Sequence, residues 1–337
     1  MSELRWHPFL EEWVITATHR QDRTFLPPPD YCPLCPTKPG GFPTEVPRDQ
    51  YDIVVFENKF PSLQKNPPVP AVEATSISPV ASAQGICEVI CYSSQHNGTL
   101  AGMDLTRIEN LIRVWQDRYH DLGSRDFVKY VYIFENKGEA VGVTLHHPHG
   151  QIYAFPFIPP KIEREIDASA RYYQNNGRCL CCDAVAAEIA ARQRIVLEGD
   201  RFVAFIPFFA RYPYEVYLTS KDHLASLAGL TSADRKDLAL VLKGLLIKYD
   251  LLFGISFPYI MAIHQAPTDG RDYPHYHLHF EFYPPLRTAT KLKYLAGCEA
   301  GAGNFINDTL AEEKAAELRA LGPQSIAAVL RWDQKGE

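Results

Sequence analysis

The two halves of the chain share a segment of similar sequence, and this similarity constrains the fold more than any other feature. Residues 88–96 read EVICYSSQH, residues 215–223 read EVYLTSKDH, and each is followed by Leu-Ala-Gly at the same distance, with a constant offset of 127 residues. A close cysteine pair precedes each segment. A long amphipathic stretch, a strand-like run and a group of histidines follow it in the same order. This repeated order predicts an internal duplication, that is, two copies of one α+β unit.

Two long stretches have helical periodicity, and they alternate with runs rich in β-branched and aromatic residues. Apolar residues recur on one helical face in 104–122 and in 232–250, which predicts two long helices. Further helices are expected at 161–174, 181–193 and 309–321. Strands are expected at 51–56, 86–93, 127–134, 151–157, 202–207, 214–219, 257–263 and 276–283. The predicted class is α+β, a mainly antiparallel sheet flanked by helices.

The composition is that of a folded protein in a reducing compartment. The chain has 337 residues, of which 46% are hydrophobic and 22% charged. A net charge of −6 gives no general attraction to nucleic acid or to an anionic membrane. The sequence contains no apolar run of about 18 residues, and its first dozen residues carry acids and lack the apolar core of a secretory signal. We therefore expect a cytoplasmic protein with reduced cysteines and no membrane or nucleic-acid partner.

Two close cysteine pairs, one in each predicted repeat, are typical of zinc sites. Cys32 and Cys35 form a C-x-x-C pair, and two thiolates at this spacing can bind one Zn²⁺ from a tight turn. We predict that His96 and His147 complete this first set. The corresponding second set, which predicts a further zinc site, comprises Cys179, Cys182, His223 and His275.

Other interpretations of these cysteines remain open at this point. A C-x-x-C pair can serve redox chemistry, or the thiols can simply be buried. In the second set, Cys181 also offers a competing ligand. If both sets bind zinc, a closed Cys₂His₂ site has no open position for a substrate, so its role would be structural.

The segment His147-Pro148-His149-Gly150-Gln151 carries the strongest indication of chemistry. Alternate residues of an extended segment face the same side, so one histidine can bind the metal while the next faces a substrate if the backbone twists at Gly150. Imidazole is a competent nucleophile toward phosphorus and is partly neutral at physiological pH. Gln151 can donate a hydrogen bond to a phosphoryl oxygen but cannot act as an acid. The alternative interpretation is a metal-binding or buried pair of histidines.

HPHGQ at 147–151, together with FENKG at 134–138, resembles the galactose-1-phosphate uridylyltransferase family of the histidine-triad superfamily. The resemblance covers most of the chain. It also includes THRQDR at 18–23, CPLC at 32–35, FENKFPSL at 56–63 and YPPLRTATKLKYLAGCE at 283–299. It implies a duplicated histidine-triad-like unit, with one half over residues 1–160 and the other over residues 161–337.

The resemblance implies a ping-pong transfer of UMP between UDP-glucose and galactose 1-phosphate. His149 would attack the α-phosphorus of UDP-glucose to form a uridylyl-histidine, which galactose 1-phosphate then attacks. Gln151 would steady the phosphoryl oxygens. The resemblance also implies substrate contacts, in part across a homodimer, for Arg20, Arg23, Asn58, Asn136, Thr144, Lys293 and Glu299.

A second metal, often iron, is also implied by the resemblance. Its ligands would be Glu165, His264, His279 and Glu281, although the family often has histidine at the last position. The Cys179/Cys182 pair instead resembles a branch that carries a second zinc and includes relatives using ADP-glucose. Two alternatives therefore stay open: an ADP-sugar adenylyltransferase or phosphorylase, and a non-catalytic, zinc-stabilised nucleotide-binding module.

Overall fold

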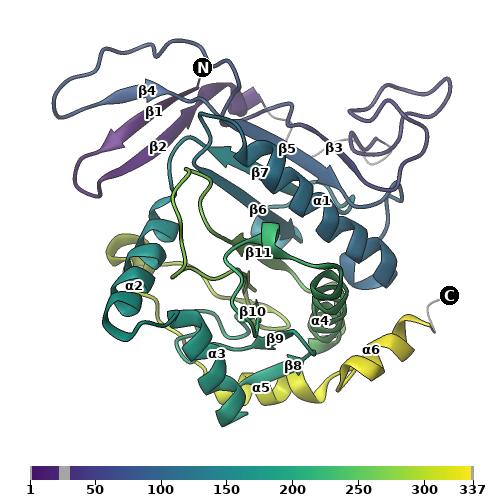
Figure 1. The fold of residues 1–337 in the computed structure, drawn as a ribbon. Helices are drawn as coiled ribbons and strands as arrows, with labels where there is room; N and C mark the ends of the chain where they lie inside the picture. Colours follow the sequence, from purple (N-terminus) through teal and green to yellow (C-terminus); the bar gives the residue numbers. More distant parts are fainter. Residues whose placement is uncertain (1, 23–30, 335–337) are drawn as a thin grey trace.

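A single nine-stranded antiparallel sheet runs through both halves of the computed structural model, which describes residues 2–22 and 31–334 (Figure 1). The first half contributes β3 (Val54–Glu57), β5 (Ile86–Cys91), β6 (Tyr130–Lys137) and β7 (His149–Phe155). The second half contributes β8 (Ile195–Glu198), β9 (Phe202–Phe205), β10 (Val216–Ser220), β11 (Tyr259–His264) and β12 (His279–Tyr283). The strand order is β3-β5-β7-β6-β11-β12-β10-β9-β8.

The strand order shows the duplication directly. The order β3-β5-β7-β6 of the first half recurs as β9-β10-β12-β11 in the second half, which adds β8 at its edge. The two copies meet where β6 pairs antiparallel with β11, in a register that runs from Lys137 opposite Tyr259 to Ile133 opposite Ile263. The predicted α+β class and its duplicated unit are therefore confirmed.

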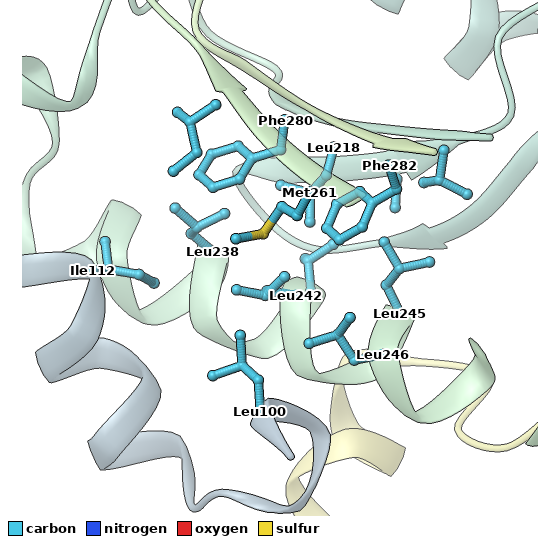
Figure 2. Packing of buried hydrophobic residues seen from close by; sticks show 14 of the residues in the cluster. Leu100, Ile112, Leu218, Leu238, Leu242, Leu245, Leu246, Met261, Phe280 and Phe282 are labelled. Carbon is cyan, nitrogen blue, oxygen red and sulfur yellow. The ribbon is translucent and has the colours of Figure 1, made fainter. Parts of the chain in front are cut away.

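Two long helices, α1 (Leu105–Gly123) and α4 (Ser232–Leu252), pack against each other and cover one face of the sheet. Each begins at a capping side chain, Asp104 for α1 and Thr231 for α4, which accepts a hydrogen bond from the first turn. Figure 2 shows the apolar side chains of α4 packed against those of β10, β11 and β12. The labelled residues on these elements are Leu238, Leu242, Leu245 and Leu246 of α4 and Leu218, Met261, Phe280 and Phe282 of the strands.

The opposite face of the sheet is covered over the second half by helices and over part of the first half by residues 2–17 and the loop of Cys32. In β9, Phe202 and Ala204 face the main core, whereas Val203 and Phe205 pack against α3 (Leu180–Ala191). The preceding helix α2 (Pro160–Asn176) packs beside Tyr130 of β6. On the same face of the first half, His149 and Gln151 of β7 are only partly buried. This part of the sheet can therefore carry a site.

All the strands and helices predicted from the sequence are present, with ends shifted by a few residues, but several short elements were not predicted. The additional strands are β1 (Ser2–His7), β2 (Glu12–Ala17), β4 (Val80–Ser82), β8, β13 (Leu286–Thr288) and β14 (Lys291–Leu292). The helices α5 (Ala311–Ala320) and α6 (Ile326–Asp333) end the described chain. Among the described helices, none has both the length and the hydropathy needed to cross a bilayer.

We expect Leu242→Ala to lower the free energy of unfolding by about 2–5 kcal/mol, because it leaves a cavity where α4 meets the sheet. Leu242 is fully buried, whereas Leu310 is 61% exposed, so Leu310→Ala is a matched control with little expected effect. Urea unfolding of both variants measures the difference. Equal effects at the two positions would contradict this account of the core.

Candidate functional site

His149 and Gln151 lie at the start of β7, paired on one side with β5 and on the other with β6. The Nδ1–H of His149 donates to the His147 carbonyl at 2.7 Å, which places the lone pair of the neutral imidazole on Nε2. Oε1 of Gln151 lies 3.4 Å from both Nδ2 of Asn58 and the hydroxyl of Tyr153, which can donate to it. The amide NH₂ is therefore the group that Gln151 can offer to an anionic oxygen.

His149 lies in the wall between two hollows. The first is lined by Asn58, Thr144 and Gln151 together with the apolar side chains of Phe56 and Val89. The second is lined by Asn136, Gly138, Thr99, His146 and Ser256. The fold thus brings His149 and Gln151 together with three predicted substrate-binding residues, Asn58, Thr144 and Asn136.

Of the other predicted substrate-binding residues, Arg20, Lys293 and Glu299 are described, and they line neither hollow. Arg20 donates from Nη1 to the Phe60 carbonyl at 2.8 Å and to the Ser62 hydroxyl at 2.9 Å. Lys293 and Glu299 form an ion pair with each other at 3.1 Å. Arg23 lies outside the described residues.

Cys32, Cys35, His96 and His147 form a compact cluster whose possible ligand atoms all lie within 4.8 Å of one another. Sγ of Cys35 lies 3.4 Å from Nδ1 of His96 and 3.6 Å from Nδ1 of His147. A tetrahedral Zn²⁺ with bonds of about 2.3 Å to sulfur and about 2.0 Å to nitrogen would separate such atoms by about 3.5 Å. These residues therefore fit the predicted metal.

The surroundings of His147 also suit a metal ligand. Its Nε2–H donates to the Ser93 carbonyl at 2.7 Å, so Nδ1 carries the lone pair that faces the thiols. Burial lowers the pKa of His147 to about 4, which keeps the imidazole neutral. Tyr51 adds its hydroxyl at 2.9 Å from Nε2.

The second Cys₂His₂ cluster contains His277, and the prediction of His275 as its fourth ligand is wrong. Cys179, Cys182, His223 and His277 lie within 4.8 Å of one another. Nδ1 of His277 is 3.7 Å from Sγ of Cys179 and 3.4 Å from Sγ of Cys182. His275 instead lies beside the rings of Tyr173 and Tyr273.

The error has a physical reason in the duplication. The offset of 127 residues holds for Ser93 and Ser220, whose carbonyls both accept from the Nε2–H of a ligand histidine. The loop before β12 is longer, so His147 corresponds to His277 rather than to His275. His149 then corresponds to His279, and the Nδ1–H of each donates to the carbonyl two residues earlier. The pair of H-x-H motifs in the sequence could have shown this correspondence.

The third predicted metal set also converges in space. Glu165, His264, His279 and Glu281 have ligand atoms within 4.8 Å of one another. Nδ1 of His264 lies 2.9 Å from Glu165, and Nε2 of His279 lies 3.3 Å from Glu281. Burial would raise the pKa of Glu165, but the charges of His264 and His279 lower it to about 2. Two imidazoles and two carboxylates suit zinc or non-haem iron, so these residues fit a metal as well.

The two carboxylates of this set have an inner and an outer side. Within the described chain, Oε1 of Glu281 is buried without a hydrogen-bond partner and faces the histidines. Its Oε2 pairs with Lys161 and lies 3.3 Å from Arg211. Lys161 also lies 3.7 Å from Oε1 of Glu165. The two cations therefore hold the outer oxygens, while the inner oxygens are directed toward the histidines.

The sequence interpretation missed Glu135, which lines the second hollow next to Asn136. It is 5% exposed, and its carboxylate lies 3.3 Å from the hydroxyls of both Tyr92 and Tyr259. Burial raises the pKa of Glu135 to about 7. The signal was present in FENKG, where an acid directly follows the apolar and aromatic run YVYIF at 130–134 of a predicted strand.

We expect His277→Ala to lose zinc from the second cluster and to lower the melting temperature, because a structural zinc contributes folding free energy. His275→Ala is the matched control and should retain its zinc. Elemental analysis after gel filtration measures the metal content of each variant. Loss of zinc in His275→Ala but not in His277→Ala would contradict the geometry.

We expect Glu135→Gln to stabilise the protein above pH 7 but not at pH 4.5. The pKa of Glu135 is about 7 in the folded state and about 4.5 in the unfolded state. Its carboxyl therefore contributes most to the free energy of unfolding below pH 4.5, and this contribution is lost as the pH rises to about 7. The full difference is about 3 kcal/mol. Urea unfolding of variant and parent at several pH values tests this, and a pH-independent difference would contradict the raised pKa.

The sequence matches two family models that together span most of the chain. Residues 1–159 match "Galactose-1-phosphate uridyl transferase, N-terminal domain" and residues 165–328 match "Galactose-1-phosphate uridyl transferase, C-terminal domain". Galactose-1-phosphate uridylyltransferase of Thermotoga maritima is 44% identical over 320 residues, covering 95% of this chain and 98% of the relative. That of Haemophilus influenzae is 37% identical, covering 94% and 93%.

A solved structure supports the same relationship. The structure titled "Structure of uridylyltransferase" superposes with a TM-score of 0.85 at 35% identity, covering 98% of this chain and 99% of that chain. The similarity extends over both halves of the fold. This chain belongs to the galactose-1-phosphate uridylyltransferase family.

Proposed function

We propose that the protein exchanges UMP between UDP-glucose and galactose 1-phosphate through a uridylyl group on His149. The observation that carries this proposal is the position of His149 between two hollows, with Gln151 beside it. A ping-pong transfer requires the nucleotide to stay bound while one hexose phosphate leaves and another enters. Two compartments on either side of the nucleophile meet this requirement.

The first hollow suits the nucleoside. Phe56 and Val89 offer apolar surface, and Asn58 offers an amide. The second hollow is more suited to a hexose phosphate, because Asn136, Thr99 and Ser256 offer polar groups. The α-phosphate would then lie beside His149, where the boundary between the hollows is.

The chemistry follows from the groups at this boundary. The lone pair on Nε2 of His149 forms a bond to the α-phosphorus as the bond from phosphorus to the glucose 1-phosphate oxygen breaks. The amide NH₂ of Gln151 donates to a phosphoryl oxygen and offsets its charge, and Thr144 adds a hydroxyl. An oxygen of galactose 1-phosphate then forms the new bond to phosphorus as the N–P bond breaks, and the imidazole returns to its neutral state.

The metals would act on structure in this proposal. Zn²⁺ in the first cluster would hold the loop of Cys32 and Cys35 against the strand start that carries His147 and His149. Zinc in the second cluster and zinc or iron in the third would do the same for the second half. When bound, these ions supply fixed cross-links between loops and sheet, and no step of the transfer passes through them.

A homodimer would complete the site. Lys293 and Glu299 pair with each other in one chain, and we place them at the hexose-phosphate hollow of the partner subunit. Arg20 and Arg23 would add cationic groups for the phosphates. No cysteine of the described chain forms a disulfide, which suits the reducing cytoplasm.

We expect intact-mass measurement to show one uridylyl adduct after incubation with UDP-glucose and no acceptor. Galactose 1-phosphate should remove the adduct. His149→Gly should show no adduct while its zinc content and circular dichroism stay unchanged, and a variant of the exposed helix residue His120, His120→Ala, should label normally. An adduct in His149→Gly would contradict the proposal. An adenylyl adduct with ADP-glucose, in place of the uridylyl adduct, would move the protein to the ADP-sugar alternative.

A further inference from the structure

Two charged residues of the FENKG segment take no part in the proposed chemistry. Phe134 and Asn136 share one face of β6, whereas Glu135 and Lys137 alternate with them. Glu135 is almost fully buried, which is costly for a carboxyl unless it has partners. The buried carboxylate of Glu135 therefore depends on the groups that contact it.

The first partner of Glu135 is Tyr92, which lies directly against the strand that carries His149. Oε2 of Glu135 lies 3.3 Å from the Tyr92 hydroxyl. A Cβ atom placed on Gly150 would clash with this same hydroxyl and would also press on the Phe134 carbonyl. Tyr92 further donates its backbone N–H to the Pro148 carbonyl at 3.0 Å. Tyr92 thus contacts the backbone on both sides of His149.

The second partner of Glu135 comes from the other half of the molecule. Oε1 lies 3.3 Å from the hydroxyl of Tyr259, on β11. Lys137 lies over the Tyr259 ring, with Nζ 5.4 Å from its centroid, and forms an ion pair with Asp250 of α4 at 2.7 Å. The carboxyl of Glu135 therefore links the His149 strand to β11 across the seam between β6 and β11.

We propose that Glu135 is a positioning residue for the transfer site, an inference that rests on the proposed function. By holding the Tyr92 hydroxyl, Glu135 fixes how closely the backbone at Gly150 packs against Tyr92. This packing in turn places His149 and Gln151 around the α-phosphorus. Through Tyr259, Glu135 ties this placement to the second half. A shift of about 1 Å at a nucleophile can cost about 100-fold in rate.

The test compares rates of adduct formation in rapid-quench experiments with the full-length, zinc-loaded protein and UDP-glucose. The variants are Tyr92→Phe, Tyr259→Phe, Glu135→Ala and Glu135→Gln. The control is Tyr119→Phe, which also removes a buried hydroxyl, in this case one that donates to the Ala266 carbonyl at 3.0 Å. The titration of rate against UDP-glucose separates the maximal rate from the half-saturating concentration.

We expect Tyr92→Phe and Glu135→Ala to slow the maximal rate by about 10-fold to 100-fold, with little change in half-saturation. Tyr259→Phe should have a smaller effect in the same direction. Glu135→Gln should restore a near-parental rate, because an amide can bond both tyrosine hydroxyls. Tyr119→Phe should be unchanged.

Three outcomes would overturn the inference. One is a maximal rate in Tyr92→Phe equal to that of the parent protein. This result would overturn the positioning role of Glu135 but leave the proposed function intact. Another is an equal slowing in Tyr119→Phe, which would indicate a general effect of losing a buried hydroxyl. The third is the absence of any adduct in the parent protein, which would overturn the proposed function and this inference with it.

Discussion

The antiparallel pairing of β6 with β11 holds the two halves of the molecule together. It joins two copies of one unit into a single sheet, so both long helices pack on a shared core. It also places Tyr259 of the second half next to Glu135 of the first. A separate half would expose the edge of β6, whose backbone groups would then lack their partners. The site on β7 is thus supported from both halves, although His149 itself belongs to one.

The duplication has led to different uses of the same backbone geometry. In each half an H-x-H motif stands at the start of a strand, and its first histidine belongs to a Cys₂His₂ cluster. In the first half the second histidine, His149, lies between two hollows. In the second half its counterpart, His279, lies among Glu165, His264 and Glu281. The exchange of Gln151 for Glu281 adds a negative charge, and Lys161 and Arg211 offset it.

The sequence predicts those elements and site residues that a local sequence pattern defines, and it does not predict those that depend on contacts between distant residues. The helices at 104–122 and 232–250 were predicted closely, because a long apolar face defines each one. The hairpin β1–β2 was not predicted, since its apolar residues do not alternate cleanly with polar ones and most of its residues are only partly buried. His275 was chosen over His277 because the loop before β12 has a different length in the two repeats. The contacts of Glu135 join residues that are far apart in the chain. Local sequence patterns therefore could not predict its neighbours in space.

In the proposed mechanism, His149 carries the nucleotide between two hexose phosphates that never meet. Isotope exchange tests this most directly. Labelled glucose 1-phosphate is incubated with UDP-glucose and the zinc-loaded protein, with no galactose 1-phosphate present. We predict that label enters UDP-glucose and that His149→Gly abolishes this exchange. Net transfer to galactose 1-phosphate without any such exchange would require both hexose phosphates to bind together, and it would contradict the covalent account.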